Sequence, residues 1–309
     1  MRLLTIGIGK NGAEVSSLLA KKGGKVNNIQ LFKCYAIVHN IEHLKSIKLS
    51  DKNKFYLMAN ERVDTTGVLN EILSRYEIYE GSLLITSIDV EENVLTTVEI
   101  GKNLATYLDD PIIGLIIIPP LNDINVDEFK RRVNMLKKVI DVLMFIERSK
   151  ITSNYLVEAM NILGRIGEID LKRKMIGEVV VDTSDIFNTL LGEGFSIFGF
   201  AKRKILPWWI RIMLERSELK AVRTRRMIEL VKDAMRNLSV QADIKSASKA
   251  LVIFSGNPNE ITMDGLLSSI GIIESLNDKI EVRYGDYSIP KSQHLYSVLL
   301  FSGLTKLIS

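Results

Sequence analysis

The chain has 309 residues, 46% of them hydrophobic and 25% charged, and its formal net charge at pH 7 is +4. This length and apolar content predict one large domain or two packed ones, and the small net charge gives no reason to expect a nucleic-acid partner. The single cysteine, Cys34, excludes an internal disulfide and fits a reducing compartment. No apolar stretch reaches the roughly 18 residues needed to span a bilayer. No signal peptide precedes the first predicted strand, so we expect a cytoplasmic protein.

Short apolar runs alternate with amphipathic runs over the first 151 residues, as is typical of a parallel sheet with helices between its strands. The apolar runs predict strands at 3–8, 33–38, 55–58, 82–87, 112–118 and 142–146. The amphipathic runs predict helices at 12–22, 41–47, 66–76, 94–108 and 126–140. Residues 1–151 are therefore predicted to form a Rossmann-like, nucleotide-binding-like domain whose sheet is covered on both faces.

The pattern changes after residue 151. A long amphipathic helix is predicted over about 152–174, so that residues 152–176 connect two domains. The later strands are predicted at 178–181, 195–200, 250–255, 279–284 and 294–301, and the later helices at 183–191, 219–237 and 259–276. Residues 177–309 are thus predicted as a smaller mixed-sheet α+β domain with helices on one face.

One glycine-rich turn follows the first predicted strand. Its sequence, Gly7-Ile-Gly9-Lys-Asn-Gly12, satisfies G-x-G-x-x-G between a strand and a helix, which is the setting of a dinucleotide-binding turn. The second strand, however, is followed by His39 and Asn40 and lacks the acid that would hold a ribose. A dinucleotide-dependent enzyme and a tight turn without any ligand are both open interpretations.

Residues 85–98 lie where a phosphate-binding loop is expected, between an apolar run and a helix-like run. A phosphate cradle uses glycines and free backbone N–H groups, but this segment has no glycine and three acids, Asp89, Glu91 and Glu92. A phosphate within about 4 Å of each acid would meet about 1 kcal/mol of repulsion per charge pair in water, and about 4 kcal/mol in a partly buried site. The acids could instead stabilise the N-terminus of the next helix by about 0.3–1 kcal/mol each.

Element order and several local motifs resemble the tubulin/FtsZ superfamily over nearly the whole chain. The glycine turn looks like that family's first nucleotide loop. Residues 127–133, Asp-Glu-Phe-Lys-Arg-Arg-Val, resemble the FtsZ segment Phe-Glu-Gly-Lys-Arg-Arg-Met. This resemblance implies a ribose contact at Glu128 and an arginine near the phosphates at Arg132. Asn161 falls where the family reads guanine.

A second group of motifs lies in the C-terminal half. Residues 181–186, Val-Asp-Thr-Ser-Asp-Ile, resemble the family loop Leu-Asp-Phe-Ala-Asp-Val. In a filament, the two acids of that loop reach the neighbouring subunit's GTP and promote its hydrolysis, so the resemblance implies this role for Asp182 and Asp185. Family-like segments also occur at 141–150, 195–201, 232–237, 251–258 and 296–303.

The family's glycine-rich signature is absent. Where the family has Gly-Gly-Gly-Thr-Gly-Thr-Gly, this chain has Val90-Glu-Glu-Asn-Val-Leu-Thr96, and two family asparagines are replaced by Glu14 and Val180. The resemblance therefore implies a retained architecture with a degenerate GTP site. Its candidate nucleotide contacts are Gly7, Gly9, Gly12, Glu128, Arg132 and Asn161.

Several of these residues also have a purely structural interpretation. Asp182 is a natural helix N-cap, and Asp185 follows three residues later as in a capping box. Glu128 and Arg132 are four residues apart and could form an ordinary surface ion pair. His39 has a second histidine four residues later, but no third ligand is evident, so no metal site is expected.

Residues 202–216 look like an addition, placed where FtsZ has a short turn and tubulin has the loop that joins filaments side by side. Ten basic and three acidic residues occur between positions 202 and 232. Trp208, Trp209 and Ile210, with their apolar neighbours, would form a large apolar patch if they were exposed. The segment is predicted to contact a protein partner, another subunit or a membrane surface. Alternatively, the tryptophans pack beneath the helix at 219–237.

The sequence thus predicts a two-domain α/β protein of the tubulin/FtsZ type that associates with itself as a cytoskeletal or scaffolding protein. GTP binding and hydrolysis are expected to be weak or lost, no cofactor is required, and GTP remains a possible ligand. One alternative is an active, filament-forming GTPase in which an unusual loop or a metal ion compensates for the acids. The other is a dinucleotide-dependent enzyme.

Overall fold

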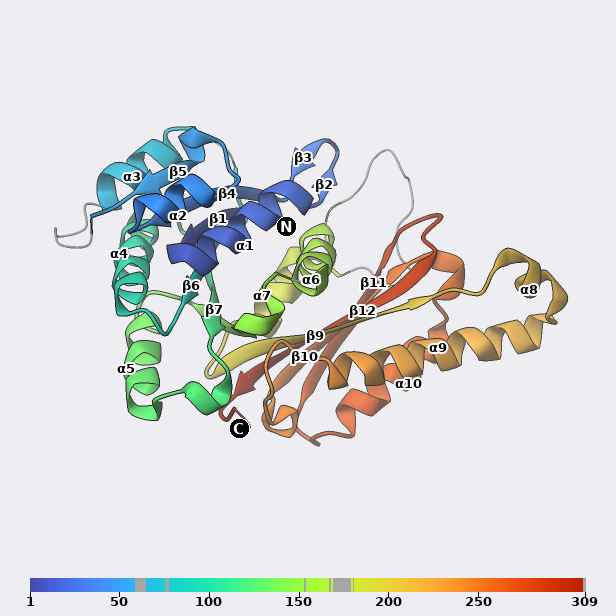
Figure 1. The fold of residues 1–309 in the computed structure, drawn as a ribbon. Helices are drawn as coiled ribbons and strands as arrows, with labels where there is room; N and C mark the ends of the chain where they lie inside the picture. Colours follow the sequence, from blue (N-terminus) through green and yellow to red (C-terminus); the bar gives the residue numbers. More distant parts are fainter. Residues whose placement is uncertain are drawn as a thin grey trace. The chain divides into compact units, whose positions relative to one another are not determined.

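In the computed structural model (Figure 1), the residues that can be described are 1–58, 65–75, 78–152, 154–166, 168, 179 and 181–307. They form two compact units, Met1–Gly164 and Arg165–Ile308. The division falls inside the segment that the sequence predicts to connect two domains.

The first unit is built on a parallel sheet. Its strands are β1 (Leu3–Ile8), β4 (Phe32–Val38), β5 (Lys54–Tyr56), β6 (Gly81–Ser87), β7 (Ile112–Ile118) and β8 (Val142–Glu147). They lie in the order β8-β7-β6-β1-β4-β5, and each neighbouring pair is parallel. All residues of β1, β6 and β7 are buried, so both faces of the sheet are covered. The predicted parallel sheet is confirmed.

The helices of this unit follow the predicted alternation with the strands. They are α1 (Gly9–Lys22), α2 (Ile41–Ser46), α3 (Thr65–Leu73), α4 (Glu91–Tyr107), α5 (Val126–Leu136) and α6 (Asn154–Arg165), with short 3-10 turns η1 (Asp51–Asn53), η2 (Leu121–Asp123) and η3 (Arg148–Lys150). The helix predicted to reach residue 174 ends at Arg165, and Ile166 and Glu168 lie outside it. Residues 169–178 lie outside the described residues, as do two of the four residues of the strand predicted at 178–181.

A small hairpin in this unit was not predicted. β2 (Lys25–Val26) and β3 (Ile29–Gln30) pair in antiparallel fashion across two asparagines, Asn27 and Asn28, whose φ angles are 51° and 69°. Asparagine tolerates this left-handed conformation better than most residues, and two-residue hairpins require it. Strands of two residues are too short to show an alternating pattern in the sequence.

The second unit carries a mixed sheet. Its strands are β9 (Phe195–Lys204), β10 (Lys249–Gly256), β11 (Glu281–Ser288) and β12 (His294–Leu304), in the order β11-β10-β12-β9. β10 and β11 are parallel, whereas β12 is antiparallel to both β10 and β9. The predicted mixed sheet is confirmed. Residues 250–256 of β10 are all buried, so both faces of this strand are covered.

The helices of the second unit are α7 (Thr183–Leu190), α8 (Trp208–Met213), α9 (Arg216–Arg236) and α10 (Met263–Glu274), with 3-10 turns η4 (Ile244–Ser246) and η5 (Pro258–Glu260). α9 packs along β9 and β12, and α10 packs against α9 and β11. Within the described ranges, no helix combines the length and apolar character that crossing a bilayer requires.

Two observations favour structural interpretations of single residues. Cys34 in β4 is 3% exposed, and burial raises the pKa of its thiol to about 12.

Gly7 and Gly12 allow backbone segments to approach closely at the end of β1. A Cβ atom at Gly7 would lie 2.1 Å from the carbonyl oxygen of Gly12, and one at Gly12 would lie 2.2 Å from that of Ile85. These two glycines are therefore required by packing, whether or not a ligand binds.

We predict that Gly12→Ala destabilises the protein by about 1–3 kcal/mol, because its methyl group would be forced against a backbone oxygen that cannot rotate away. The matched control is Gly271→Ala in α10, where no atom lies within 4 Å of the added Cβ. That control should be neutral or should stabilise the protein by up to about 1 kcal/mol. Melting temperatures measure both effects. Equal melting temperatures for the two variants would contradict the packing role of Gly12.

Candidate functional site

A cavity of about 510 Å³ lies in the first unit at the carboxyl ends of several strands. Its lining residues follow β1 (Gly9, Lys10, Asn11), β4 (His39, Asn40, His43), β6 (Asp89, Val90, Glu92, Asn93) and β8 (Arg148). The chain runs outward from β1 to β4 and β5 on one side, and from β6 to β7 and β8 on the other. The cavity is therefore at the topological switch point, where parallel α/β sheets bind their ligands.

The glycine turn faces a side chain of the same protein. Gly9 has φ of +70°, and a Cβ atom added to it would lie 2.2 Å from Nδ2 of Asn93. Asn93 is 5% exposed and lies in the first turns of α4. In a dinucleotide-binding turn, the absence of a Cβ lets the pyrophosphate approach the backbone. Here the same space is taken by the carboxamide of Asn93.

The three acids of the 85–98 segment each face a basic or imidazole group. Asp89 forms an ion pair with Arg148 of η3. Glu91 Oε1 lies 2.8 Å from Nη2 of Arg131 in α5. The hydrogen bond from the Arg131 guanidinium and its positive charge lower the pKa of Glu91. The acids are thus held by cations on other elements of the first unit.

The remaining acid, Glu92, points into the cavity. Its Oε1 lies 3.8 Å from Nδ1 of His39, is buried, and accepts no hydrogen bond among the described residues. The ring nitrogens of His39 are engaged by the carbonyl oxygen of Leu57 at 3.1 Å and by Oγ1 of Thr96 at 3.0 Å. A carboxylate oxygen with a free lone pair favours cations and hydrogen-bond donors, and it opposes phosphate.

The acids were expected to cap the helix that phosphates would otherwise cap. α4 begins at Glu91, and its N-cap Val90 makes no side-chain capping hydrogen bond. Glu91 and Glu92 lie in the first turn, so they favour the helix through their charge and not through capping hydrogen bonds.

Glu128 and Arg132 were considered as an ordinary surface pair, and this is wrong for Arg132. Arg132 is only 7% exposed; it forms an ion pair with Glu128, and its Nη1 donates to the carbonyl oxygen of Ile88 at 2.7 Å. The arginine therefore fixes the end of β6 to α5. Both residues line a second cavity of about 190 Å³, which shares Asp89 with the cavity at the glycine turn. Their roles in holding ribose and phosphate stay a prediction.

Asn161 in α6 has another set of partners. Its Oδ1 accepts from the backbone N–H of Gly24 at 2.6 Å, and its Nδ2 donates to the carbonyl oxygen of Lys22 at 3.0 Å. The two ends of the amide thus join α6 to the last residue of α1 and to Gly24, just beyond that helix. Asn161 is not among the described residues that line either cavity, and its proposed role as the guanine reader stays a prediction.

Asp182 and Asp185 form the predicted capping box. The Asp182 carboxylate accepts from the N–H of Asp185, and the Asp185 carboxylate accepts from the N–H of Asp182. The Ser184 hydroxyl and the Asp185 N–H donate to Asp182 and lower the pKa of its carboxyl group. Asp185 also lies 2.7 Å from Nη1 of Arg283 in β11. The capping interpretation is confirmed, and both acids are engaged within the second unit.

The tryptophans of the 202–216 segment lie in α8. Trp208 is 66% exposed and Trp209 is 51% exposed, whereas Ile210 is half-buried. The alternative in which both tryptophans pack beneath the helix at 219–237 is therefore wrong. Of the α8 side chains, Arg211 is the one that pairs with the buried Glu260 of η5.

Sequence reasoning missed the cations and the amide that complete the first unit's site. The sequence signal for Arg131 and Arg148 was weak. Arg148 directly follows β8, and Arg131 lies in α5, the helix that follows β7. Both therefore come after strands whose carboxyl ends lie at the same edge of the sheet. Asn93 gave no signal, since only the folded turn of α4 brings its side chain over Gly9. No group of three or more histidine, cysteine, aspartate or glutamate side chains that could hold a metal occurs in the part of the chain that the structure describes.

We predict that Asp182→Ala lowers the free energy of unfolding by about 0.5–2 kcal/mol, and that Asp182→Asn loses much less because an amide oxygen still caps. The folded-state pKa of Asp182 lies below its ordinary value of 3.8, so its charge-dependent stabilisation is complete above that value. It is lost as the pH falls through the folded-state pKa. Urea unfolding from about pH 7 down to about pH 3 should show the wild type and Asp182→Ala converging. A difference that does not change with pH would contradict this.

The comparisons with known proteins agree on one family. The family model described as "Tubulin-like CetZ, C-terminal domain" matches residues 149–308, which is more than half of the 309-residue chain. The tubulin-like protein CetZ1 of Haloferax volcanii is 25% identical over 351 aligned residues, which cover 99% of this chain and 89% of CetZ1.

Solved structures show the same fold. The GDP-bound monomer of CetZ1 superposes with a TM-score of 0.80 at 21% identity, covering 99% of this chain and 96% of that one. A GTPγS-bound protofilament of CetZ2 from Haloferax volcanii gives 0.78 at 18% identity, covering 99% and 94%. The empty FtsZ dimer of M. jannaschii gives 0.69 at 14% identity, covering 98% and 88%. The resemblance to the tubulin/FtsZ superfamily is thus confirmed, and the chain belongs to the tubulin-like CetZ family.

Proposed function

We propose that this chain is a self-associating cytoskeletal or scaffolding protein whose GTP binding and hydrolysis are weak or lost. Its family membership supports the cytoskeletal class. A CetZ2 structure with a TM-score of 0.78 to this chain is a protofilament, which supports self-association.

One observation carries the proposal. The space over Gly9 that a pyrophosphate would need is filled by the Asn93 amide, which is 5% exposed. A phosphate would have to displace a packed side chain and then sit beside Asp89 and Glu92 in the same cavity. Each charge pair at about 4 Å opposes binding by about 1 kcal/mol in water and by about 4 kcal/mol in a partly buried site.

The nearby arginines do not offset this repulsion between a phosphate and the carboxylates. Arg148 and Arg131 already neutralise Asp89 and Glu91, so a phosphate would gain their charge only by leaving two carboxylates without partners. Arg132 is committed to Glu128 and to a backbone carbonyl. In effect, carboxylates of the protein occupy the positions around these arginines that a bound anion would take.

The residues that resemble the hydrolytic acids are committed as well. Asp182 and Asp185 cap α7, and Asp185 pairs with Arg283. Acids that reach a neighbouring subunit would have to give up these contacts. This supports weak or absent hydrolysis even if a nucleotide were bound.

A true GTP-binding polymeriser is the second candidate. The cavity volume of about 510 Å³ and the presence of Lys10 at its edge favour it. The CetZ1 structure with GDP and the CetZ2 structure with GTPγS show that relatives hold these nucleotides. In this case Arg148 would exchange Asp89 for a phosphate, assisted by a metal ion between the nucleotide and the acids. The dinucleotide-dependent enzyme has no support from the family assignment.

We predict that the wild type binds a fluorescent GTP analogue without saturation in the micromolar range, with or without Mg²⁺. The double variant Asp89→Asn, Glu91→Gln should bind at least about tenfold more tightly, because it removes two repulsive charges and releases two arginines. The matched control is Glu99→Gln, which removes an acid of the same helix whose nearest cation is Lys102 at 3.9 Å. It should leave the affinity unchanged. Micromolar binding by the wild type would favour the second candidate.

We also predict that the protein forms sedimentable assemblies whose amount rises with protein concentration and changes little when GTP is added. The reason is that contacts between the folded surfaces of two subunits do not require a nucleotide in the candidate site. Sedimentation and light scattering over a range of concentrations measure it. A strictly monomeric protein at high concentration would sink the scaffold proposal, and assembly only with GTP would support the second candidate.

A further inference from the structure

α8 lies at one end of the second unit, beyond the N-terminus of α9 (Figure 1). Trp208, Trp209, Ile212 and Met213 are 66%, 51%, 73% and 79% exposed. Trp208 and Ile212 are four residues apart, as are Trp209 and Met213, so the four side chains share one face of the helix. Large apolar side chains gathered in this way mark an interaction site more often than an ordinary surface.

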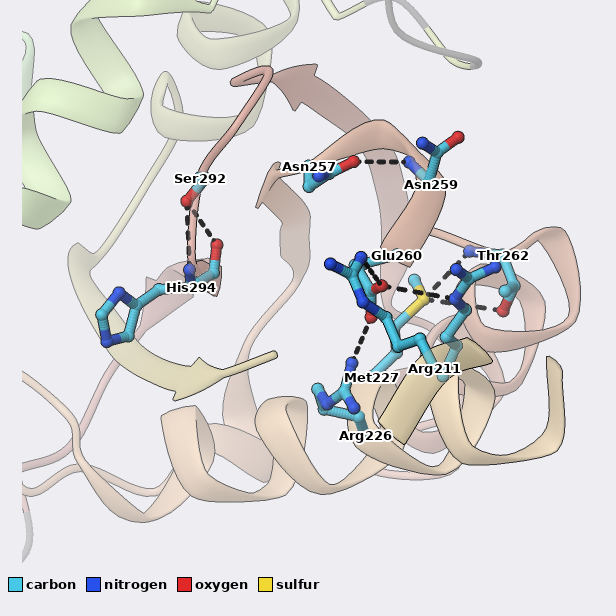
Figure 2. Close-up of polar contacts among 10 residues, drawn as sticks. Arg211, Arg226, Met227, Asn257, Asn259, Glu260, Thr262, Ser292 and His294 are labelled. Atoms are coloured by element: carbon cyan, nitrogen blue, oxygen red, sulfur yellow. Dashed lines mark hydrogen bonds and ion pairs between the residues drawn. The ribbon is translucent and has the colours of Figure 1, made fainter. Parts of the chain in front are cut away.

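The opposite side of α8 is fixed to the fold by charge. Figure 2 shows Arg211 directed toward Glu260, which is fully buried. Arg211 Nη1 lies 3.4 Å from Glu260 Oε1, and Arg226 of α9 also pairs with this carboxylate. Arg223 Nε lies 3.4 Å from the same Oε1. Since a buried carboxylate without partners would be strongly unfavourable, this cluster holds α8 in a defined orientation.

The consequence is an amphipathic helix whose polar side faces inward. A short connection packed only for stability would turn its tryptophans inward and its arginine outward. Here the half-buried residues Ile210 and Leu214 supply limited packing, and the charged group is used as the anchor. The exposed apolar face is therefore a built feature of the second unit.

The surroundings of this face are basic. Between positions 202 and 232 there are ten basic and three acidic residues. Lys204 and Arg216, which flank α8 on the two sides in sequence, are exposed. Of the acids, Glu215 is engaged in the capping box of α9 with Glu218, and Glu229 pairs with Arg203. Six of the ten basic residues pair with acids, some of which lie beyond this segment (Asp233, Glu260 and Asp264). The positive charge that the face itself offers is therefore that of the exposed Lys204 and Arg216. This charge is complementary to an anionic surface and opposes a second copy of the same face.

We propose that α8 docks on an anionic lipid surface, with its tryptophans in the headgroup region and with Lys204 and Arg216 against lipid phosphates. Tryptophan prefers the interface between water and hydrocarbon, and basic side chains gain attraction from anionic headgroups. A one-and-a-half-turn helix that projects four large side chains from the end of a unit is convex. This shape suits a fluid surface better than the groove of a protein partner. The proposal goes beyond the degenerate nucleotide site and does not depend on self-association.

The chain supplies its own probe, because Trp208 and Trp209 are its only two tryptophans. Intrinsic fluorescence of the full chain is recorded with vesicles of phosphatidylcholine alone and with vesicles that also contain phosphatidylglycerol. We expect a blue shift and co-flotation with the anionic vesicles only, both decreasing as salt is raised. Lipids brominated near the headgroup should quench the emission.

Three variants, measured by co-flotation with vesicles, distinguish the proposed contacts from non-specific adsorption. Trp208→Ser with Trp209→Ser should weaken vesicle binding at least tenfold, and Lys204→Glu with Arg216→Glu should do so while both tryptophans remain. The matched control is Met263→Ser with Leu267→Ser, which removes two apolar side chains of α10 that are 46% and 55% exposed and also four residues apart. This control should bind like the wild type. Unchanged melting temperatures are expected, since all of these side chains are exposed.

Several outcomes would overturn the proposal. They are no blue shift with anionic vesicles, an equal shift with phosphatidylcholine alone, or wild-type binding by the tryptophan variant. A blue shift that appears with rising protein concentration in the absence of lipid would assign the face to a second copy of the chain. Self-association of the tryptophan variant, measured without lipid, is expected to match that of the wild type. The self-association proposal is therefore tested independently of the membrane proposal.

Discussion

The pairing of carboxylates with arginines at the carboxyl edge of the first unit's sheet determines the charge of the candidate site. A parallel sheet brings the ends of β1, β4, β6 and β8 to one place, and an anion would normally bind there. In this chain Asp89 and Glu91 form ion pairs with Arg148 and Arg131. The Asn93 amide occupies the space beside the backbone of Gly9 in the glycine turn. The positive charge of Arg131 and Arg148 is thus paired with carboxylates of the first unit.

The second unit uses the same kind of interaction for another purpose. Glu260 is fully buried beside three arginines of α8 and α9, and this arrangement fixes a short helix whose apolar side chains face solvent. In both units a carboxylate determines where arginines are directed. In the first unit the pairing occupies a site, and in the second it presents a surface.

The sequence predicted most elements correctly because they are regular and buried. The strands at 3–8 and 112–118 agree with the structure to the residue, since continuous apolar runs between helices have few other solutions in an α/β fold. Shorter or irregular features were missed. The hairpin across Asn27 and Asn28 has too few residues to show a pattern, and the helix predicted to reach residue 174 ends at Arg165.

By itself the sequence determined the alternation of strands and helices, the family motifs, and the replacement of a glycine-rich loop by three acids, because each of these is a local property of neighbouring residues. Only the tertiary structure decided what the acids and tryptophans contact. Arg132 is buried and not part of a surface pair, Asn93 lies over Gly9, and Trp208 faces solvent. Such contacts join residues far apart in the chain, and their burial depends on the packing of whole elements, which no local pattern records.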